Sequence, residues 1–324
     1  MTDALQEQLQ DRRVKLQAAI TQTGEDERLL GLLREVDLAL ERAHEGTFGL
    51  CEVCHEAIEA DRLAADPLVT RCLDHLTSAE VRALEQDLQL ASRVQRTLLP
   101  PREFARDGWE LAYHYAPIGV VSGDYCDVVG PASDDGGRVF FLLGDISGKG
   151  VAASMLMAHL HAAVRTLLGV GLPIDQVLAR TNRLFCESTS ASHYATLVCG
   201  SLAASGQIEL CNAGHCPPLL VRGSGVTSLA ATGLPVGMFC TADYSVSRLT
   251  LASGDALVLY TDGLTEARNR ADAEYGTERL LRVLVNHPAS GARDLVNSCV
   301  NDLSVFLSGA SRADDLTVMA IRRI

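Results

Sequence analysis

The spacing of apolar residues changes near residue 108, and this change limits the fold more than any other feature of the chain. Before it, apolar side chains recur every three or four residues, which is the period of a helix buried along one side. After it, short apolar runs alternate with turns rich in glycine and aspartate, which is typical of strands. The sequence therefore predicts a helical amino-terminal part followed by a larger domain built on sheets.

Two helices are predicted at the amino end. Residues 4–22 and 26–44 each place leucines along one helical stripe. Thr23 or Asp26 can cap the second helix, because both side chains can accept a hydrogen bond from a free backbone N–H. The pair predicts an antiparallel helical hairpin over residues 1–45.

The next helical stretch, residues 78–101, has the spacing of a coiled-coil seam. Thr77 and Glu80 form a capping-box pattern at its start, and a proline pair stops it. The a and d positions are Val81, Leu84, Leu88, Ala91, Gln95 and Leu98. They predict a helical linker that forms a parallel homodimer through residues 78–99, with Gln95 fixing the register. The seam has only about two and a half heptads, so packing of this face on the chain's own domain is the open alternative.

Residues 102–324 are predicted to form one α+β domain. The predicted strands are Trp109–Pro117, Val139–Ile146, Ala195–Leu202, Gln207–Cys211, Leu219–Val221, Ala256–Tyr260 and Thr317–Ile321. The predicted helices cover residues 151–169, 173–188, 277–287 and 291–308. Because strands and helices do not alternate regularly, antiparallel sheets in layers with helices are expected in place of a parallel βαβ sheet.

A metal site is predicted within residues 46–77. Cys51 and Cys54 form one chelating pair, and Cys72 and His75 form another. Each pair can point both side chains at one ion, and three thiolates with one imidazole suit tetrahedral Zn²⁺. The spacing therefore predicts one structural zinc ion.

Four aspartates stand at turn-forming ends of apolar runs. They are Asp124 in VSGDYCDV, Asp145 in FFLLGDISGKG, Asp262 in LVLYTDGLTEARN and Asp314 in RADDLTVMAI. A single Asp-Gly pair is a common turn, but four such positions can project carboxylates from sheet ends into one cleft. Two hard cations close together need carboxylate ligands of this kind, and they can activate a water for hydrolysis of a phosphoester.

These motifs, with the segments ASRVQRTLLPP and CNAGHCPPLL, resemble the SpoIIE/RsbU branch of the metal-dependent protein phosphatases, the PPM family, over residues 91–324. The resemblance implies a β-sandwich flanked by helices and two ions of Mn²⁺ or Mg²⁺. It implies hydrolysis of phosphoserine or phosphothreonine by an activated water. The implied partner is a phosphorylated protein, such as a STAS-domain anti-sigma-factor antagonist.

The resemblance also implies a role for each site residue. Asp145 would be the catalytic carboxylate that bridges both metals, and the backbone carbonyl of Ile146 would be a further ligand. Asp124 would serve one side of the metal pair, and Asp262 and Asp314 the other. Of the neighbouring Asp314 and Asp315, Asp314 is the expected direct metal ligand.

The cysteine-rich segment and the helix before it, roughly residues 30–77, resemble the zinc-finger region of the DksA/TraR family, whose members bind RNA polymerase. The fourth ligand here is His75 where that family usually has a cysteine. The resemblance gives an alternative function, a transcription regulator with a catalytically silent carboxy-terminal domain. The hairpin tip lacks the aspartate-alanine pattern of those regulators, which favours a structural, sensing or dimerising role.

Charge and hydropathy limit the partners and the location. Residues 1–90 hold 19 acidic and 9 basic residues, and acidic surfaces repel nucleic acid. No run of about 20 uncharged apolar residues occurs, and the first residues lack the pattern of an export signal. These features predict a cytoplasmic protein that binds neither a membrane nor, directly, a nucleic acid.

Some further residues carry weaker expectations. Lys149, one of only two lysines, could touch a phosphate, but a solvated lysine is the favoured interpretation. Ser122 could narrow the backbone freedom next to Asp124. His215 is expected to order a turn between strands. Reduced, small apolar fillers are expected at Cys126, Cys186, Cys199, Cys211, Cys216, Cys240 and Cys299.

Overall fold

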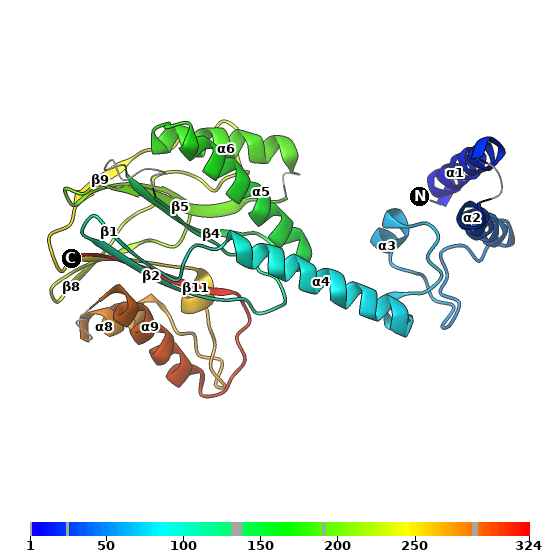
Figure 1. The fold of residues 1–324 in the computed structure, drawn as a ribbon. Coiled ribbons are helices and arrows are strands. Elements are labelled where there is room, and N and C mark those ends of the chain that lie inside the picture. The colour runs from blue at the N-terminus through cyan, green and yellow to red at the C-terminus, as the bar shows by residue number, and fades with distance from the viewer. Residues whose placement is uncertain (1, 24–25, 131–137, 190–191, 287–290) are drawn as a thin grey trace. The chain divides into compact units, whose positions relative to one another are not determined.

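The computed structural model describes residues 2–23, 26–130, 138–189, 192–286 and 291–324 (Figure 1). The chain folds as two compact units, Met1–Gln86 and Asp87–Ile324. The boundary falls within one long helix, so the division into four segments stays a prediction.

The first unit begins with two helices, α1 (Thr2–Thr23) and α2 (Glu27–Glu45), packed through the buried side chains of Leu9, Val36 and Ala39. Asp26 is the cap of α2, because its carboxylate accepts a hydrogen bond from the backbone N–H of Arg28 at 2.8 Å. A small module follows, with helix α3 (Ala60–Ala65) and the 3₁₀ turn η1 (Leu73–His75). Its core holds Cys51, Ile58, Leu63 and Cys72, so two of the predicted zinc ligands are also its main buried residues.

Helix α4 (Ser78–Leu98) begins with the predicted capping box: the Glu80 N–H donates to the Thr77 hydroxyl, and the Thr77 N–H donates back to the Glu80 carboxylate. The predicted role of Gln95 in a dimer seam is wrong. Gln95 is buried within the second unit, where its amide donates to the Ser122 carbonyl at 2.7 Å and accepts from the Ser122 N–H at 3.0 Å. Val81 and Leu84 are exposed, so only the first half of the seam is free to meet another chain.

The second unit is a sandwich of two sheets in which every strand pair is antiparallel. The six-stranded sheet has the order β1 (Glu103–Arg106), β2 (Trp109–Ala116), β11 (Leu316–Arg323), β10 (Ala256–Tyr260), β7 (Leu219–Arg222) and β8 (Gly225–Ser228). The five-stranded sheet has the order β3 (Tyr125–Val129), β4 (Val139–Ile146), β5 (Ala195–Leu202), β6 (Gln207–Ala213) and β9 (Ser247–Thr250). The predicted α+β class is confirmed.

Three apolar layers hold the sandwich together. The layer between the sheets contains Trp109, Phe141, Leu257, Met319 and Ile321. Helices α5 (Gly150–Gly169) and α6 (Ile174–Ser188) cover the five-stranded sheet, and α8 (Thr277–Asn286) and α9 (Ala292–Leu307) cover the six-stranded one (Figure 1). The four predicted helices are confirmed within a few residues, except that predicted position 287 lies outside the described residues.

Strand β3 was not predicted, because Asp127 interrupts its apolar run. The Asp127 side chain is nevertheless fully buried, and Arg165 of α5 donates two hydrogen bonds of 2.8 Å to it. A buried carboxylate is tolerated when it is paired and hydrogen-bonded in this way. The ion pair also fixes α5 against the sheet.

Helix α5 is the one described helix that is long and apolar enough to cross a membrane by length and composition. Its buried residues, among them Met157, Leu160 and Val164, belong to the core beneath it. Its apolar character therefore has a use inside the folded domain.

The prediction for two of the cysteines is wrong. Cys186 on α6 and Cys240 form a disulfide, with their Cα atoms 5.8 Å apart. Cys126, Cys199, Cys211 and Cys299 are free, buried and packed as predicted. Spacing along the chain could not reveal the pair, because 54 residues separate its members.

Candidate active site

Three of the four predicted aspartates line one pocket of about 390 Å³ at the end of β4. Asp145 is the last residue but one of strand β4, Asp262 begins the short helix α7 (Asp262–Thr265), and Asp314 lies just before β11. Ile146 lines the same pocket. Residues far apart in the sequence therefore converge because both sheets of the sandwich end at this place.

Asp124 lies behind the pocket and is almost completely buried. One of its carboxylate oxygens accepts hydrogen bonds from the hydroxyls of Thr317 and, at 3.1 Å, Thr261. Burial raises the pKa of Asp124 well above its usual range, and the nearby charge of Asp145 raises it further. Both threonines come from the strand ends that carry Asp262 and Asp314, so they tie Asp124 to the same site.

The clustered carboxylates repel one another. Burial, and then the charges of Asp262, Asp314 and Asp315, raise the pKa of Asp145 to about 7. Burial, and then Glu266 and Asp314, raise the pKa of Asp262. A divalent cation would relieve this repulsion, and carboxylate oxygens are the ligands that Mg²⁺ and Mn²⁺ prefer. The donor set therefore fits hard divalent cations.

Two glycines allow the loops to approach this closely. A Cβ on Gly123 would lie 3.0 Å from the Ile146 carbonyl oxygen and 3.6 Å from an Asp145 carboxylate oxygen. A Cβ on Gly263 would overlap the Asp315 carbonyl oxygen. Gly263 is therefore required by the packing at the site, whereas a side chain at position 123 would fit only if its neighbours shifted by a few tenths of an ångström.

Asp315 does not line the pocket, but it holds the loop before Asp124 in place. Its carboxylate accepts hydrogen bonds from the Ile118 N–H at 2.7 Å, the Ser122 hydroxyl at 2.7 Å and the Gly123 N–H at 2.9 Å. Apart from the paired aspartates, no feature of the sequence indicates these long-range bonds. The same is true of the contacts that Thr261 and Thr317 make with Asp124.

Ser122 acts on the backbone next to Asp124 through hydrogen bonds. Its hydroxyl donates to Asp315 and accepts from the Asp124 N–H at 3.0 Å. Ser122 is also the residue whose backbone pairs with Gln95. It therefore orders the Asp124 loop through its side chain and its backbone.

Lys149 is not a purely solvated lysine. Its ammonium group lies 2.8 Å from an Asp314 carboxylate oxygen and donates to the Ala313 carbonyl at 2.8 Å, although its side chain is 61% exposed. The side-chain hydrogen bond with Asp314 raises the pKa of Lys149. Lys149 thus places a fixed positive charge on the rim of the acidic pocket.

His215 orders a turn, as predicted, and also lines the pocket. Its N–H donates to the Asn212 side chain at 2.8 Å, and its ring Nδ1 lies 2.8 Å from the Thr196 hydroxyl. Burial lowers the pKa of His215 to about 4. The ring is therefore neutral near pH 7.

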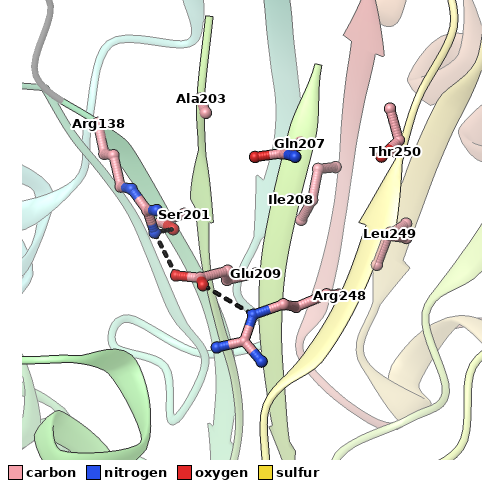
Figure 2. A pocket seen from close by; sticks show the side chains of 9 residues that line it. All are labelled: Arg138, Ser201, Ala203, Gln207, Ile208, Glu209, Arg248, Leu249 and Thr250. Atoms are coloured by element: carbon pink, nitrogen blue, oxygen red, sulfur yellow. Dashed lines mark hydrogen bonds and ion pairs between the residues drawn. The ribbon is translucent and has the colours of Figure 1, made fainter. Parts of the chain in front are cut away.

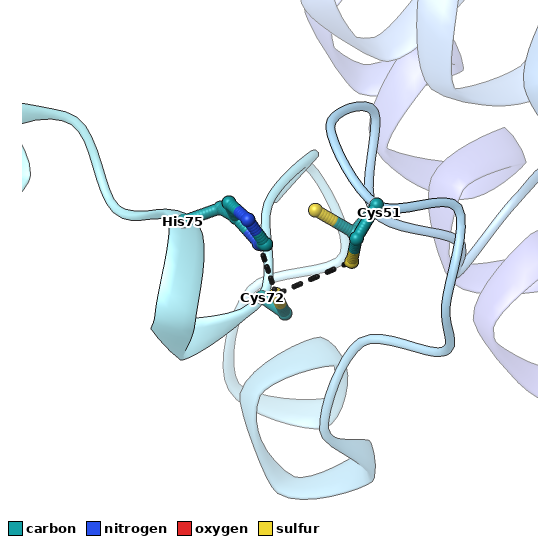
Figure 3. Close-up of side chains that lie close together, drawn as sticks. Cys51, Cys72 and His75 are labelled. Carbon is teal, nitrogen blue, oxygen red and sulfur yellow. Dashed lines mark hydrogen bonds between the residues drawn. The ribbon is translucent and has the colours of Figure 1, made fainter.

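The predicted zinc ligands meet in the first unit. One ligand atom from each of Cys51, Cys54, Cys72 and His75 lies within 4.8 Å of the others. Figure 3 shows Cys51, Cys72 and His75 close together, and the Cys72 sulfur is 3.2 Å from the His75 Nδ1. Among the described residues no other set of three or more such ligands is this compact. The cluster suits a single ion, whereas the aspartates are spread more widely.

A second cavity, of about 260 Å³, lies near the opposite end of β4 (Figure 2). There Arg138 and Arg248 both pair with Glu209, and Arg138 also donates to the Ser201 hydroxyl at 3.1 Å. None of the predicted site residues lines it. It is therefore separate from the aspartate pocket.

Comparison with known proteins gives separate matches for two parts of the chain. Residues 46–74 match the prokaryotic dksA/traR C4-type zinc finger. IcfG of Synechocystis sp. is 26% identical over 266 residues, which cover 73% of this chain and 41% of IcfG. The phosphoserine phosphatase RsbU of Bacillus subtilis is 27% identical over 243 residues, 74% of this chain and 71% of RsbU. The chain thus spans less than half of the first of these relatives.

The solved structures agree on the fold. The SiaA-PP2C domain of Pseudomonas aeruginosa superimposes with a TM-score of 0.64 over 76% of this chain and 99% of that domain, at 22% identity. Residues 135–324 match the family described as stage II sporulation protein E (SpoIIE). That match covers more than half of the chain and includes three of the four aspartates, and so the chain belongs to the SpoIIE family.

Proposed function

We propose that this protein is a metal-dependent phosphatase acting on phosphoserine or phosphothreonine in another protein. The observation that carries the proposal is the pocket in which Asp145, Asp262 and Asp314 converge, with Asp124 buried behind it. The relationship to RsbU, which is named a phosphoserine phosphatase, supports the same reaction class.

Five groups would hold two cations of Mn²⁺ or Mg²⁺. Asp145 would be shared by both ions, with the Ile146 carbonyl as a further ligand, Asp124 on one side, and Asp262 and Asp314 on the other. Bound cations of this kind neutralise phosphoryl oxygens and acidify a coordinated water. The zinc-finger match and the Cys-His cluster support a separate, structural Zn²⁺ on Cys51, Cys54, Cys72 and His75.

The chain's own side chains would keep this site in shape during the reaction. The hydroxyls of Thr261 and Thr317 hold one oxygen of Asp124, which fixes the direction of the other. Asp315 fixes the loop that carries Asp124. Pre-positioned ligands of this kind avoid the cost of rearrangement when a phosphoryl group binds.

The substrate would be a phosphorylated signalling protein, such as a STAS-domain anti-sigma-factor antagonist, met in the cytoplasm. We also propose a homodimer through residues 78–99, now limited to the half of α4 that exposes Val81 and Leu84. The acidic first unit argues against direct binding of nucleic acid.

The test is phosphate release from phosphorylated antagonist proteins and from matched phosphoserine, phosphothreonine and phosphotyrosine peptides. Release should require Mn²⁺ or Mg²⁺, stop in EDTA, and favour the first two peptides over phosphotyrosine. Asp294→Asn, an exposed change on α9, serves as a charge-matched control that should keep full activity. Metal-independent release, or none from any phosphorylated substrate, would contradict the proposal.

A further inference from the structure

The disulfide between Cys186 and Cys240 is unusual within this chain. Eight other cysteines in the described residues are free, and three of them belong to the metal-ligand cluster. A single disulfide among many free thiols is more often a redox-responsive pair than a structural one when thiols are kept reduced. Cys240 is an exposed residue, which favours access of a thiol in solution to the disulfide.

The disulfide holds a loop that adjoins the aspartate pocket. In this loop Val236 exchanges two backbone hydrogen bonds of 2.8 Å with Ala195, the first residue of β5. The preceding residue, Tyr194, lines the pocket and exchanges hydrogen bonds of 2.9 Å with Ser147, two residues after Asp145. The backbone pairing of Val236 with Ala195 therefore joins the loop to the segment that forms the pocket wall.

The same loop presents apolar side chains to solvent. Leu234, Met238 and Phe239 are 50%, 41% and 53% exposed, and Tyr194 on the pocket wall is 36% exposed. Apolar side chains gathered beside a polar pocket are typical of a protein-binding surface. Because Val236 of this loop pairs with Ala195, the residue after Tyr194 on the pocket wall, the occupant of the loop surface would be the protein whose phosphoryl group enters the pocket.

Part of the loop would stay anchored without the disulfide. The Asn182 side chain of α6 donates to the Phe239 carbonyl at 2.8 Å and accepts from the Gly237 N–H at 2.8 Å. Together with the Val236 pairing, these bonds hold the first half of the loop. Breaking the disulfide would therefore leave the domain folded and remove the covalent tether at Cys240, the residue next to Phe239, so the exposed Phe239 end of the apolar surface would be held less firmly.

We propose that Cys186 and Cys240 form a reversible redox site whose state sets how well this loop binds the phosphoprotein substrate. The proposal rests on the proposed phosphatase function for its substrate. In the oxidising direction, the two thiols lose two electrons and two protons to a small-molecule disulfide, one sulfur–sulfur bond forms, and the small disulfide becomes two thiols. In the reducing direction the sulfur–sulfur bond breaks and two thiols form, while a dithiol becomes a disulfide or a phosphine takes the oxygen of a water molecule and becomes a phosphine oxide.

The experiment uses the full chain equilibrated with oxidised glutathione or with tris(2-carboxyethyl)phosphine. Alkylation under native conditions and mass spectrometry report the state of the pair, and hydrogen–deuterium exchange reports the loop at residues 234–242. Rates are measured on phosphorylated casein and on p-nitrophenyl phosphate. Zinc content is measured after each treatment, so that loss of metal from the Cys51 cluster is detected.

After reduction, alkylation should add one alkyl group to each of Cys186 and Cys240. Hydrogen–deuterium exchange in the loop should also become faster. Reduction should raise KM for phosphorylated casein about five-fold, while kcat/KM for p-nitrophenyl phosphate, which is too small to reach the loop, stays within about two-fold. The double variant Cys186→Ser with Cys240→Ser should behave as the reduced protein under both treatments.

Two results would overturn the proposal. One is a pair that resists reduction until the protein is denatured, which is the behaviour of a structural disulfide. The other is complete reduction with unchanged loop exchange and an unchanged KM for casein. If neither substrate is hydrolysed in either state, the phosphatase function has failed, and alkylation and loop exchange alone then decide whether the redox site exists.

Discussion

At the scale of single residues, the site depends on side chains that would not bind metal. Asp315 satisfies three donors of the loop before Asp124, and the two on Ser122 and Gly123 are buried. Hydrogen bonds to a charged, buried acceptor contribute more to stability than neutral ones, and an unpaired buried donor carries a penalty. Asp315 and Asp314 are neighbours with separable roles.

Asp315→Asn should therefore damage both folding and metal binding. The amide has one acceptor oxygen in place of two and turns an NH₂ toward a donor, which should lower the free energy of unfolding by about 2–3 kcal/mol. Asp314→Asn should leave stability in EDTA nearly unchanged and weaken Mn²⁺ binding. Urea unfolding in EDTA, with Mn²⁺ titration of both variants, checks the difference; equal stability loss in the two would refute the separate roles.

The raised pKa of Asp145 predicts that the stability of the metal-free protein depends on pH. The pKa of Asp145 is raised to about 7 in the folded state, above the value of an unfolded aspartate. The folded state therefore binds the proton more tightly, so the free energy of unfolding should rise as pH falls from about 7 to about 4. Asp145→Asn should flatten this part of the profile. Denaturant unfolding in EDTA across the range tests it, and an unchanged slope in the variant would contradict the assignment.

The four aspartates could be predicted because each follows or precedes a recognisable apolar strand. Asp315, Thr261 and Thr317 could not, because their partners lie on other strand ends far away in sequence. The hydrogen bonds of Ser122 could not be predicted for the same reason: its hydroxyl has its role only after the Asp315 loop has packed beside it.

At the scale of elements, strands with strongly apolar patterns could be predicted from the sequence, and some strands whose pattern includes polar residues were missed. Strands β4, β5 and β10 were predicted within a residue because they are continuous apolar runs buried on both faces. Strand β3 was missed because of its buried Asp127, and edge strand β9 because its pattern is largely polar. The end of α4 was assigned to a dimer because a glutamine that binds its own domain has the same spacing as one in a seam.

Helix α4 gives a prediction about assembly. Val81→Glu with Leu84→Glu places like charges on the exposed half of the seam, so a parallel dimer should separate into monomers. Light scattering measures the mass, and Arg82→Glu, on the same helix but outside the seam, is the control. A monomeric wild type, or an unchanged dimer in the double variant, would show that α4 is not the interface.

At the scale of the whole molecule, two compact units would each depend on a different metal chemistry. The small zinc module has a core of few residues, two of which are its cysteines. Modules of this kind gain on the order of 10 kcal/mol from zinc and commonly unfold without it. The second unit has an extensive sandwich core, so we expect it to fold without metal and to need cations only for its proposed activity.

Protein purified without added metal should accordingly contain close to one zinc per chain. Removal with a strong chelator should unfold the zinc module of the first unit and leave the second unit folded, because the core of that module is small and includes two of its ligands. Elemental analysis and two-stage thermal unfolding measure this, with Cys51→Ser and His55→Ala as ligand and neighbouring non-ligand variants. Zinc retained after Cys51→Ser together with Cys54→Ser would contradict the ligand set.

The central claim is that the four aspartates form one metal-dependent catalytic site, and Asp145→Asn tests it most directly. Mn²⁺ binding by calorimetry and phosphoserine-peptide hydrolysis are measured on the wild type, on Asp145→Asn and on the control Asp294→Asn. The wild type and the control should bind two Mn²⁺ and hydrolyse the peptide. Asp145→Asn should bind fewer ions and lose at least about 10³-fold in rate, equivalent to about 4 kcal/mol of transition-state stabilisation. Near wild-type turnover with two ions still bound would contradict the account.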